Sequence, residues 1–256
     1  MNYNYHTHTH WCDHATGTPE EYIQNAIRGG IQFMGFSDHA PWIFPDGYES
    51  HYRVPMAKAE NYMEELRDLR KTYQGQIQLS IGFEMEFYPL YFEKMLETAR
   101  QFGAEYLILG QHFLGNEHPG GHSSQRYAGN DGQLIEYVDT VVQAMKTGIF
   151  TYVAHPDIFK FEGKEGFYLR QMEKICAASC EKNIPLEINF LGIRENRNYP
   201  DQRFWELAGK FGCPVTFGFD AHEAESAFDG ASLQKAKAMV EKYHLNYIGK
   251  PELVRP

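Results

Sequence analysis

The sequence predicts an α/β barrel formed by one domain, with a metal site at the carboxyl ends of its strands. Short apolar, β-rich runs alternate with helix-like stretches along all 256 residues, which is the pattern of parallel βαβ units. Most of these runs are followed by His, Asp or Glu, at the end of the strand where barrel enzymes carry their catalytic residues. No linker, repeat or low-complexity segment divides the chain, so residues 1–256 are expected to form a single domain.

The helices are predicted from a capping signal and from apolar periodicity. Thr18-Pro19-Glu20-Glu21 is a capping box with proline at the first helical position, and its helix is expected to end at Gly29-Gly30. Further helix-like stretches cover residues 56–73, 91–102, 133–146, 167–182, 201–210 and 231–243. Strand-like runs lie between them, at residues 32–36, 76–87, 106–111, 150–154, 186–190, 215–219 and 246–248. So many alternating units in one domain favour a barrel over an open sheet.

Composition excludes several classes of protein. Hydrophobic residues make up 43% of the chain, which is enough for one large core. The formal net charge of −10 argues against a nucleic-acid-binding protein, because phosphate backbones require a basic surface. No signal peptide follows Met1, and no run approaches the roughly 20 apolar residues of a membrane span. A cytoplasmic protein without membrane contact is therefore expected, and its oligomeric state is left open.

The four cysteines predict neither a zinc finger nor a disulfide framework, because their spacing matches neither pattern. Cys176 and Cys180 lie four residues apart in a helix-like stretch, so we expect them to face a neighbouring element as small side chains. Cys12 lies among the first histidines, where a role as metal ligand is an alternative to simple packing.

Histidine and carboxylate residues recur where the strand-like runs end. His6 and His8 fall on the same face of the first strand, where two imidazoles can chelate one metal ion. A single histidine of this kind is usually structural, but the joint pattern favours ligation. The candidate metal ligands are His6, His8, His14, His39, Glu84, His112, His155, Asp220 and His222. His10 is expected to lie beside the ligands rather than among them.

The types of ligand favour particular metals and a particular number of ions. Imidazole and carboxylate groups without thiolates suit zinc, manganese or iron better than magnesium or calcium, and zinc is favoured. At about four to six ligands per ion, so many candidates imply two or three divalent ions. Glu84 is the natural bridge, because the two oxygens of a carboxylate can bind two cations. The irregular segments 41–55 and 115–132 each follow a candidate ligand and are predicted to be active-site loops.

The order of these motifs resembles the PHP family, the polymerase and histidinol phosphatase metallophosphoesterases. The matching motifs are HTHTH at 6–10, SDH at 37–39, GFE at 82–84, GQH at 110–112, AHPD at 154–157 and DAH at 220–222. The resemblance implies a distorted TIM-like (β/α)7 barrel, in which the run at 246–248 is not expected to take part. It also implies that Asp38 and Asp157 orient neighbouring histidines.

The resemblance further implies how the ligands are shared among the ions. The first ion would be held by His6, His8, Glu84 and Asp220. The second would be held by Glu84, His112 and His155. The third would be held by His14, His39 and His222.

Within the family, the chain is most similar to the histidinol-phosphate phosphatase branch, through the loop after His112 and the segment 187–200. This implies a phosphoric monoester hydrolase that releases phosphate from L-histidinol phosphate in histidine biosynthesis. Arg194 would bind the substrate phosphate, with Lys160 as a second basic residue and Arg126 as a substitute. The candidate catalytic residues are Glu84, Asp220 and His222, and either of the last two could protonate the leaving group.

Three alternatives remain open on the sequence alone. The same site could act on another small phosphoester, such as a nucleotide, a sugar phosphate or phosphotyrosine. A metal-dependent amidohydrolase also carries HxH on its first strand, but its usual bridging lysine has no counterpart here. A metal-binding regulatory module would show no turnover with any phosphoester.

Overall fold

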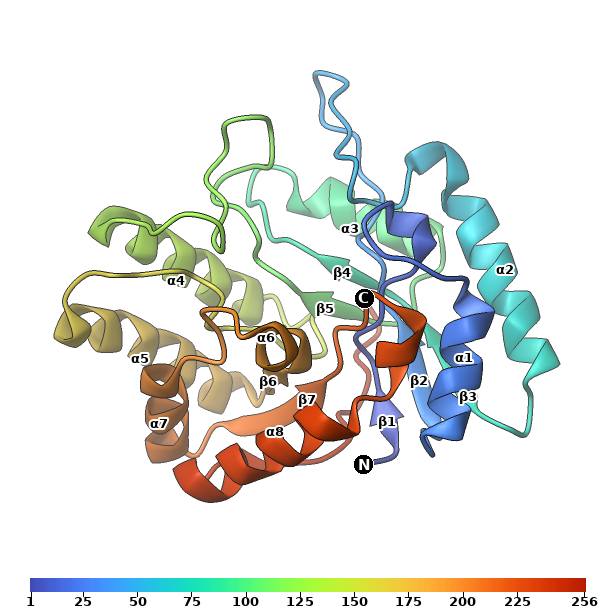
Figure 1. Ribbon diagram of the computed structural model, residues 1–256. Helices are drawn as coiled ribbons and strands as arrows, with labels where there is room; N and C mark the ends of the chain where they lie inside the picture. The colour runs from blue at the N-terminus through green and yellow to red at the C-terminus, as the bar shows by residue number, and fades with distance from the viewer.

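A computed structural model describes all residues from Met1 to Pro256 and has the predicted α/β class. The strands are β1 (Tyr3–Asn4), β2 (Phe33–Phe36), β3 (Gln78–Ile81), β4 (Phe83–Met85), β5 (Leu107–Leu109), β6 (Leu186–Asn189), β7 (Pro214–Gly218) and β8 (Asn246–Tyr247). The α-helices are α1 (Pro19–Arg28), α2 (Ala59–Thr72), α3 (Phe92–Gln101), α4 (Asp131–Lys146), α5 (Glu165–Lys182), α6 (Phe190–Glu195), α7 (Gln202–Phe211) and α8 (Gly230–Tyr243). Figure 1 shows the helices around the outside of the strands, with long loops at one end.

All strand pairs are parallel, and they form three separate ladders instead of a closed barrel. The ladders have the orders β1-β2-β3, β4-β5 and β6-β7-β8. Single bridges connect them, among which Thr7 pairs with Ala221, and Val153 pairs with both Leu109 and Leu186. The predicted strand at 150–154 therefore makes only isolated bridges. The strand β8 pairs with the outer side of β7, starting at Pro214 and Asn246.

The capping box predicted for α1 is confirmed. Thr18 accepts a hydrogen bond from the Glu21 amide, and the Glu21 carboxylate accepts one from the Thr18 amide at 2.7 Å. These two bonds satisfy amide groups that have no partner within the helix. The first turn of α1 is therefore anchored just after the segment that carries the first histidines.

Two predicted elements differ in the structure. The run at 76–87 is divided into β3 and β4 at Gly82, where a Cβ atom would lie 2.3 Å from the Tyr106 carbonyl oxygen. The run at 186–190 ends one residue early, because Asn189 caps the short helix α6 by accepting a hydrogen bond from the Gly192 amide at 3.1 Å. A local cap thus overrides β propensity here. No helix is long and apolar enough to cross a membrane.

Two apolar clusters surround the strands. The larger cluster packs the helices against the outer faces of the strands, and it includes Cys176 and Cys213. The smaller cluster contains Tyr3, Tyr5, Tyr106, Ile108, Tyr152 and Ala154. Within it, the Tyr106 hydroxyl donates to the carbonyl oxygens of Tyr5 and Phe36 at 2.9 and 3.0 Å. These tyrosines join strands from different ladders and leave the carboxyl ends of the strands free for polar residues.

Candidate metal centre

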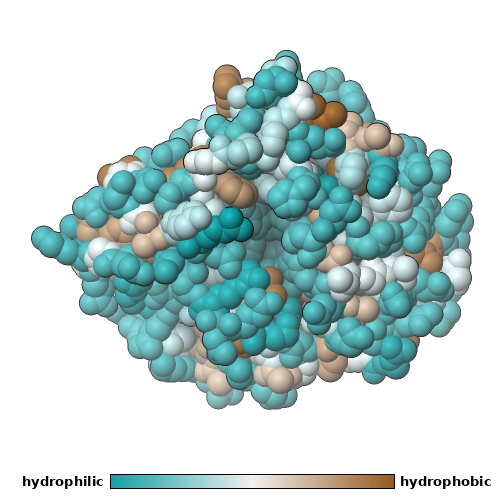
Figure 2. All heavy atoms as spheres, turned by 45° about the horizontal axis from the view of Figure 1, so that its top comes forward, coloured by the Kyte–Doolittle hydropathy of each residue, from teal (hydrophilic) through white to brown (hydrophobic).

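A cavity of about 1430 Å³ lies at the carboxyl ends of the strands. Figure 2 shows it as a hollow in a mostly hydrophilic face. Histidine and acidic side chains form its floor, and the loops at 41–55 and 115–132 form part of its wall. The candidate ligands that line the cavity are His8, His14, His39, Glu84, His112, His155, Asp220 and His222. The ninth, His6, is buried, and its Nε2 lies 3.5 Å from both Glu84 Oε2 and Asp220 Oδ1.

Glu84 lies at the centre of the cluster, and its two oxygens face different histidines. Its Oε2 is 3.2 Å from His8 Nε2, 3.5 Å from His6 Nε2 and 3.6 Å from His39 Nδ1. Its Oε1 is 3.1 Å from His155 Nε2 and 3.4 Å from His112 Nε2. A carboxylate in this position can contact two cations at once.

Asp220 forms a second point of convergence. Its Oδ1 is 3.2 Å from His222 Nδ1 and 3.5 Å from His6 Nε2, while its Oδ2 accepts a hydrogen bond from Asn189. On the exposed side of this group, His222 Nε2 lies only 3.0 Å from His14 Nε2. Two imidazole nitrogens that face one another so closely need either a shared proton or a cation between them.

Backbone geometry also marks the site. His155 has φ 33° and Asp220 has φ 46°, so both occupy the left-handed region that side chains other than glycine rarely adopt. Strain of this kind costs of the order of 1–3 kcal/mol per residue and is found mostly at functional sites. At Gly110 a Cβ atom would lie 1.9 Å from Glu84 Oε1, so only glycine leaves room for this carboxylate.

Two buried carboxylates orient histidines, but they are not the predicted ones. Glu187 Oε1 is 2.7 Å from His6 Nδ1, and Glu86 Oε1 is 2.8 Å from His112 Nδ1. Because an ionised carboxylate can only accept, each ring donates through Nδ1 and presents Nε2 to the cavity. Strand alternation could have indicated Glu86, which lies two residues after Glu84 on the same face, but it does not identify the histidine that Glu86 contacts.

The expected orienting roles of Asp38 and Asp157 are wrong. Asp38 accepts hydrogen bonds from the amide and hydroxyl of Thr9. Asp157 accepts from the Asp201 amide and from the Trp205 indole, so it anchors the start of α7. Asp38 directly precedes His39, so the two side chains point to opposite sides of the extended chain. Asp157 lies two residues after His155, but the chain turns at His155, where φ is 33°, and the carboxylate faces α7 instead.

The ionisable groups of the site strongly perturb one another. Burial and the neighbouring His222 lower the pKa of His8 to about 3 and the pKa of His14 to about 4. Burial opposes the charge on His112, but Glu84 and Glu86 outweigh it and raise its pKa to about 9. Burial also opposes the charge on Glu84, yet the surrounding histidines hold its pKa well below the usual range. Cationic partners therefore stabilise the negative charge at the centre of this cluster.

The donor set fits divalent cations. Glu84, Glu86, Glu187 and Asp220 are at most 3% exposed, and a single buried arginine, Arg53, contacts only one of them. Burying negative charge without a counter-charge is costly, so these carboxylates require positive charge from protonated histidines or from bound cations. Several buried atoms that face the cluster have no hydrogen-bond partner, namely His6 Nε2, His8 Nε2, His39 Nδ1, Glu84 Oε1 and Asp220 Oδ1. Such atoms are free to act as ligands.

The geometry suggests groupings of ligands that differ in part from those implied by the family resemblance. Sets of three with donor atoms within 4.8 Å of one another include His6-His8-Glu84, as expected for a first ion. However, His39 is grouped with Glu84 and His112, and His155 with His6 and Asp220. Cys12 also lies near His8 and His14, although its thiol donates to the Thr9 carbonyl oxygen at 3.2 Å. His10 is exposed and bonds to the Gly17 carbonyl, away from the cluster.

The basic residues divide into two groups. Arg126, Lys160 and Arg197 line the cavity. Arg194 does not, because its guanidinium group donates to the carbonyl oxygens of Phe219 and Asp220 and pairs with Asp229 at 3.2 Å. In the structure Arg197, and not Arg194, is therefore placed where its side chain could contact a molecule bound in the cavity.

The aromatic residues of the two loops differ in where they lie. Trp42 and Phe44 are buried in the core beneath their loop, whereas Tyr48 and Tyr127 line the cavity. The cavity is also lined by Tyr52, Phe113 and Tyr199.

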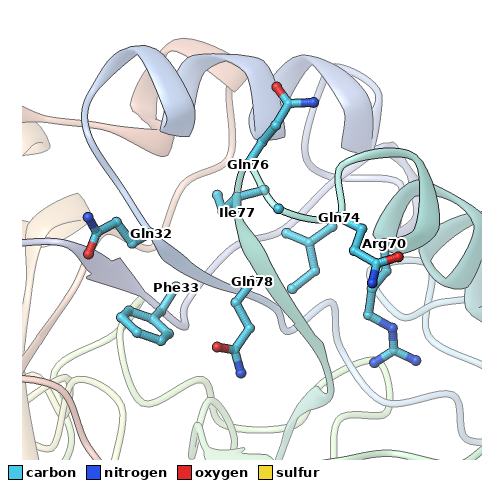
Figure 3. A pocket seen from close by; sticks show the side chains of 9 residues that line it. Gln32, Phe33, Arg70, Gln74, Gln76, Ile77 and Gln78 are labelled. Atoms are coloured by element: carbon cyan, nitrogen blue, oxygen red, sulfur yellow. The ribbon is translucent and has the colours of Figure 1, made fainter.

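A second, shallower hollow lies far from this cluster, around the start of β3 and the end of α2 (Figure 3). Glutamine side chains dominate its lining, and its arginine, Arg70, pairs with Glu105 at 2.5 Å. No set of converging His, Cys, Asp or Glu side chains occurs there. The chemistry of the molecule is therefore concentrated in the large cavity.

Comparison with known proteins identifies a matching family and similar proteins. Residues 4–190 match the model of the PHP domain. The chain is 28% identical over 226 residues to the probable histidinol-phosphatase of Deinococcus radiodurans, covering 85% of each chain. It is 23% identical over 251 residues to the histidinol-phosphatase of Bacillus subtilis, covering 86% of this chain and 92% of the other.

A solved structure has the same fold. The histidinol phosphate phosphatase of Lactococcus lactis, complexed with zinc, L-histidinol and phosphate, aligns with a TM-score of 0.73 at 20% identity. The alignment covers 96% of this chain and 95% of that one.

Proposed function

Since the chain belongs to the PHP domain family, we propose that it is a metal-dependent phosphomonoesterase that hydrolyses L-histidinol phosphate to L-histidinol and phosphate. This proposal rests on the cavity, in which candidate metal ligands form the floor and basic residues lie in the wall. A phosphomonoester dianion requires positive charge from both sides. The two curated relatives described above carry the same activity in their names and match over most of their length.

The residues that would hold the cations are His6, His8, His14, His39, Glu84, His112, His155, Asp220 and His222. Bound divalent cations supply Lewis-acid stabilisation of the phosphoryl oxygens and activate the attacking water. Glu84 faces both halves of the cluster, Glu187 and Glu86 fix the rings of His6 and His112, and Asn189 holds Asp220. The protein thus determines where the positive charge lies before the substrate arrives.

The cavity wall would bind the phosphate through Arg197 and Lys160, with Arg126 on the loop at 115–132 as a further basic residue. Arg197 donates to the Tyr199 hydroxyl at 3.0 Å, and the Tyr199 ring lies 5.7 Å from the His155 ring. Tyr199 therefore holds the guanidinium group close to the candidate ligands. Lysine in place of arginine at 160 keeps the charge but offers no bidentate contact. Asp220 and His222 remain the candidates for protonating the leaving alkoxide.

We also infer that the three ladders correspond to a distorted seven-stranded barrel. Single bridges connect the ladders in a circular order: His39 pairs with Glu84, Val153 with Leu109 and Leu186, and Thr7 with Ala221. Loss of regular pairing at these points is compatible with the crowded ligands that follow them.

We expect purified protein to contain two to three divalent transition-metal ions per chain, zinc being favoured over manganese or iron, because no smaller number uses so many converging imidazoles. A strong chelator should abolish phosphatase activity, and adding back the metal should restore it. Elemental analysis before and after reconstitution provides the measurement. One ion or none per chain after reconstitution would contradict the expectation.

The substrate is tested with a panel of phosphomonoesters. We expect kcat/KM for histidinol phosphate to exceed that for generic aryl phosphates by at least roughly 10²-fold, the scale of a few kcal/mol in differential binding. The reason is that aromatic side chains around the cavity suit a small flat ring better than a large, protein-borne phosphotyrosine. Nucleotides and sugar phosphates serve as further comparisons. Equal rates on all esters would leave the phosphatase chemistry but remove the assigned substrate.

A further inference from the structure

Arg53 is a completely buried arginine that lies between two buried carboxylates. Its side chain is 0% exposed, as are those of Glu86 and Glu117. Nη2 donates to both carboxylates, Nε donates to Glu117 Oε1 at 2.6 Å, and Nη1 donates to the Ala40 carbonyl oxygen at 2.8 Å. The guanidinium group thus donates through each of its three nitrogens, and a lysine, which has a single nitrogen, could not reproduce this set of contacts.

One of the two carboxylates leads directly to the metal centre. Glu86 contacts Arg53 through Oε2 and His112 Nδ1 through Oε1, at 2.8 Å in the second case. His112 Nε2 in turn faces Glu84 Oε1 at 3.4 Å. Arg53 is therefore two hydrogen bonds away from the ring nitrogen that would bind a cation.

The other carboxylate ties together the two loops of the cavity wall. Glu117, on the loop at 115–132, accepts hydrogen bonds from Ser50 Oγ and Tyr52 Oη at 2.6 Å each. Both donors belong to the loop at 41–55, as does Arg53 itself. Burial opposes the charge on Glu117, but Arg53 overcomes it and lowers the pKa of Glu117 to about 2. The carboxylate therefore stays ionised at neutral pH and holds the loops together.

We propose that Arg53 is a positioning residue. By pairing with Glu86 and Glu117 at the same time, it holds the His112 imidazole in place for cation binding. It also connects this candidate ligand to both cavity loops. The inference rests on the metal centre of the proposed function. A buried ion pair contributes little net stability compared with packed apolar groups. Such an arrangement directly behind a ligand is better explained by orientation of the ligand, which outer hydrogen-bond partners of metal-bound histidines provide.

The test compares zinc binding in the wild type, Arg53→Lys, Glu86→Gln and the double variant, using competition with a chromophoric chelator. Arg53→Lys keeps the charge but loses the fork, and we expect the most weakly held zinc to bind roughly 10- to 100-fold more weakly. Phosphatase kcat should fall at limiting zinc and recover when zinc is added, with KM near the wild-type value. Since Arg53 acts through Glu86, the double variant should bind zinc no more weakly than Glu86→Gln alone.

Arg203→Lys is the matched control, because Arg203 also pairs with a carboxylate, Asp201, at 2.6 Å but contacts no candidate ligand. It should bind zinc like the wild type. If Arg53→Lys does not fold, Glu117→Gln makes the same comparison by removing one partner of Arg53 at constant size. Wild-type zinc affinity in a destabilised variant would show a purely structural role, and additive losses in the double variant would show that Arg53 does not act through Glu86; either result would overturn the proposal. Zinc binding is measured without substrate, so an inactive wild type would refute the proposed function and leave this test intact.

Discussion

Replacing Glu84 by glutamine is expected to lower kcat/KM for phosphomonoesters by at least roughly 10³-fold, the largest effect of any single substitution considered for this protein. Glu84 is the only side chain within 3.6 Å of five candidate histidine ligands, with Oε1 facing two of them and Oε2 facing three. An amide has one oxygen acceptor instead of two and carries no negative charge. Glutamine therefore cannot bridge two cations.

The same substitution should lower the number of bound metal ions without unfolding the protein. Glu84 is buried among polar side chains, and glutamine fills nearly the same volume. Steady-state kinetics, elemental analysis and circular dichroism on one preparation measure the three quantities. Glu105→Gln provides a control, since Glu105 pairs with Arg70 away from the cavity. If Glu84→Gln kept full activity and metal content, the cluster would not be the reactive centre.

The convergence of the candidate ligands could be predicted from sequence because strand geometry makes their positions regular. Side chains two residues apart, such as His6 and His8, point to one face, and residues that follow parallel strands meet at one edge. The structure brings all nine into one cluster. Their division among ions could not be derived in this way, because it depends on distances of a few ångströms between different strands.

The surroundings of the ligands were harder to predict. Glu187 and Glu86 face histidines that lie 181 and 26 residues away in the chain, and Arg53 reaches Glu117 across 64 residues. Nothing local in the sequence encodes such pairs. Asp38 and Asp157 lie within two residues of a candidate ligand in sequence, yet they accept hydrogen bonds from Thr9 and from residues at the start of α7.

In the fold as well, features set by neighbouring residues could be predicted, whereas features set by contacts between distant segments could not. The α1 capping box is a pattern within four residues, and it is present as predicted. The closure of the strands depends on single bridges between segments far apart, such as Thr7 and Ala221. Strand-like composition at 150–154 could not reveal that this segment pairs only at Val153, because pairing is decided by its neighbours.

The second large effect is expected when Arg197 and Arg194 are each replaced by alanine. The two residues lie in the same segment but face different surroundings. Arg197→Ala should raise KM for phosphomonoesters and lower kcat/KM by about 10²- to 10³-fold, as expected for loss of a charged donor at a phosphoryl group. Its guanidinium group lines the cavity and is held there by Glu195 and Tyr199. Inorganic phosphate should also inhibit this variant more weakly.

Arg194→Ala should act differently. Arg194 donates to the carbonyl oxygens on either side of the left-handed turn at Asp220. Its loss should disturb Asp220, so kcat and metal content should fall while KM and inhibition by phosphate change little. Side-by-side kinetics of the two alanine variants, with phosphate as inhibitor, distinguish the roles. A large rise in KM for Arg194→Ala, with Arg197→Ala unaffected, would return phosphate binding to Arg194 and require its side chain to leave the Asp220 turn when substrate binds.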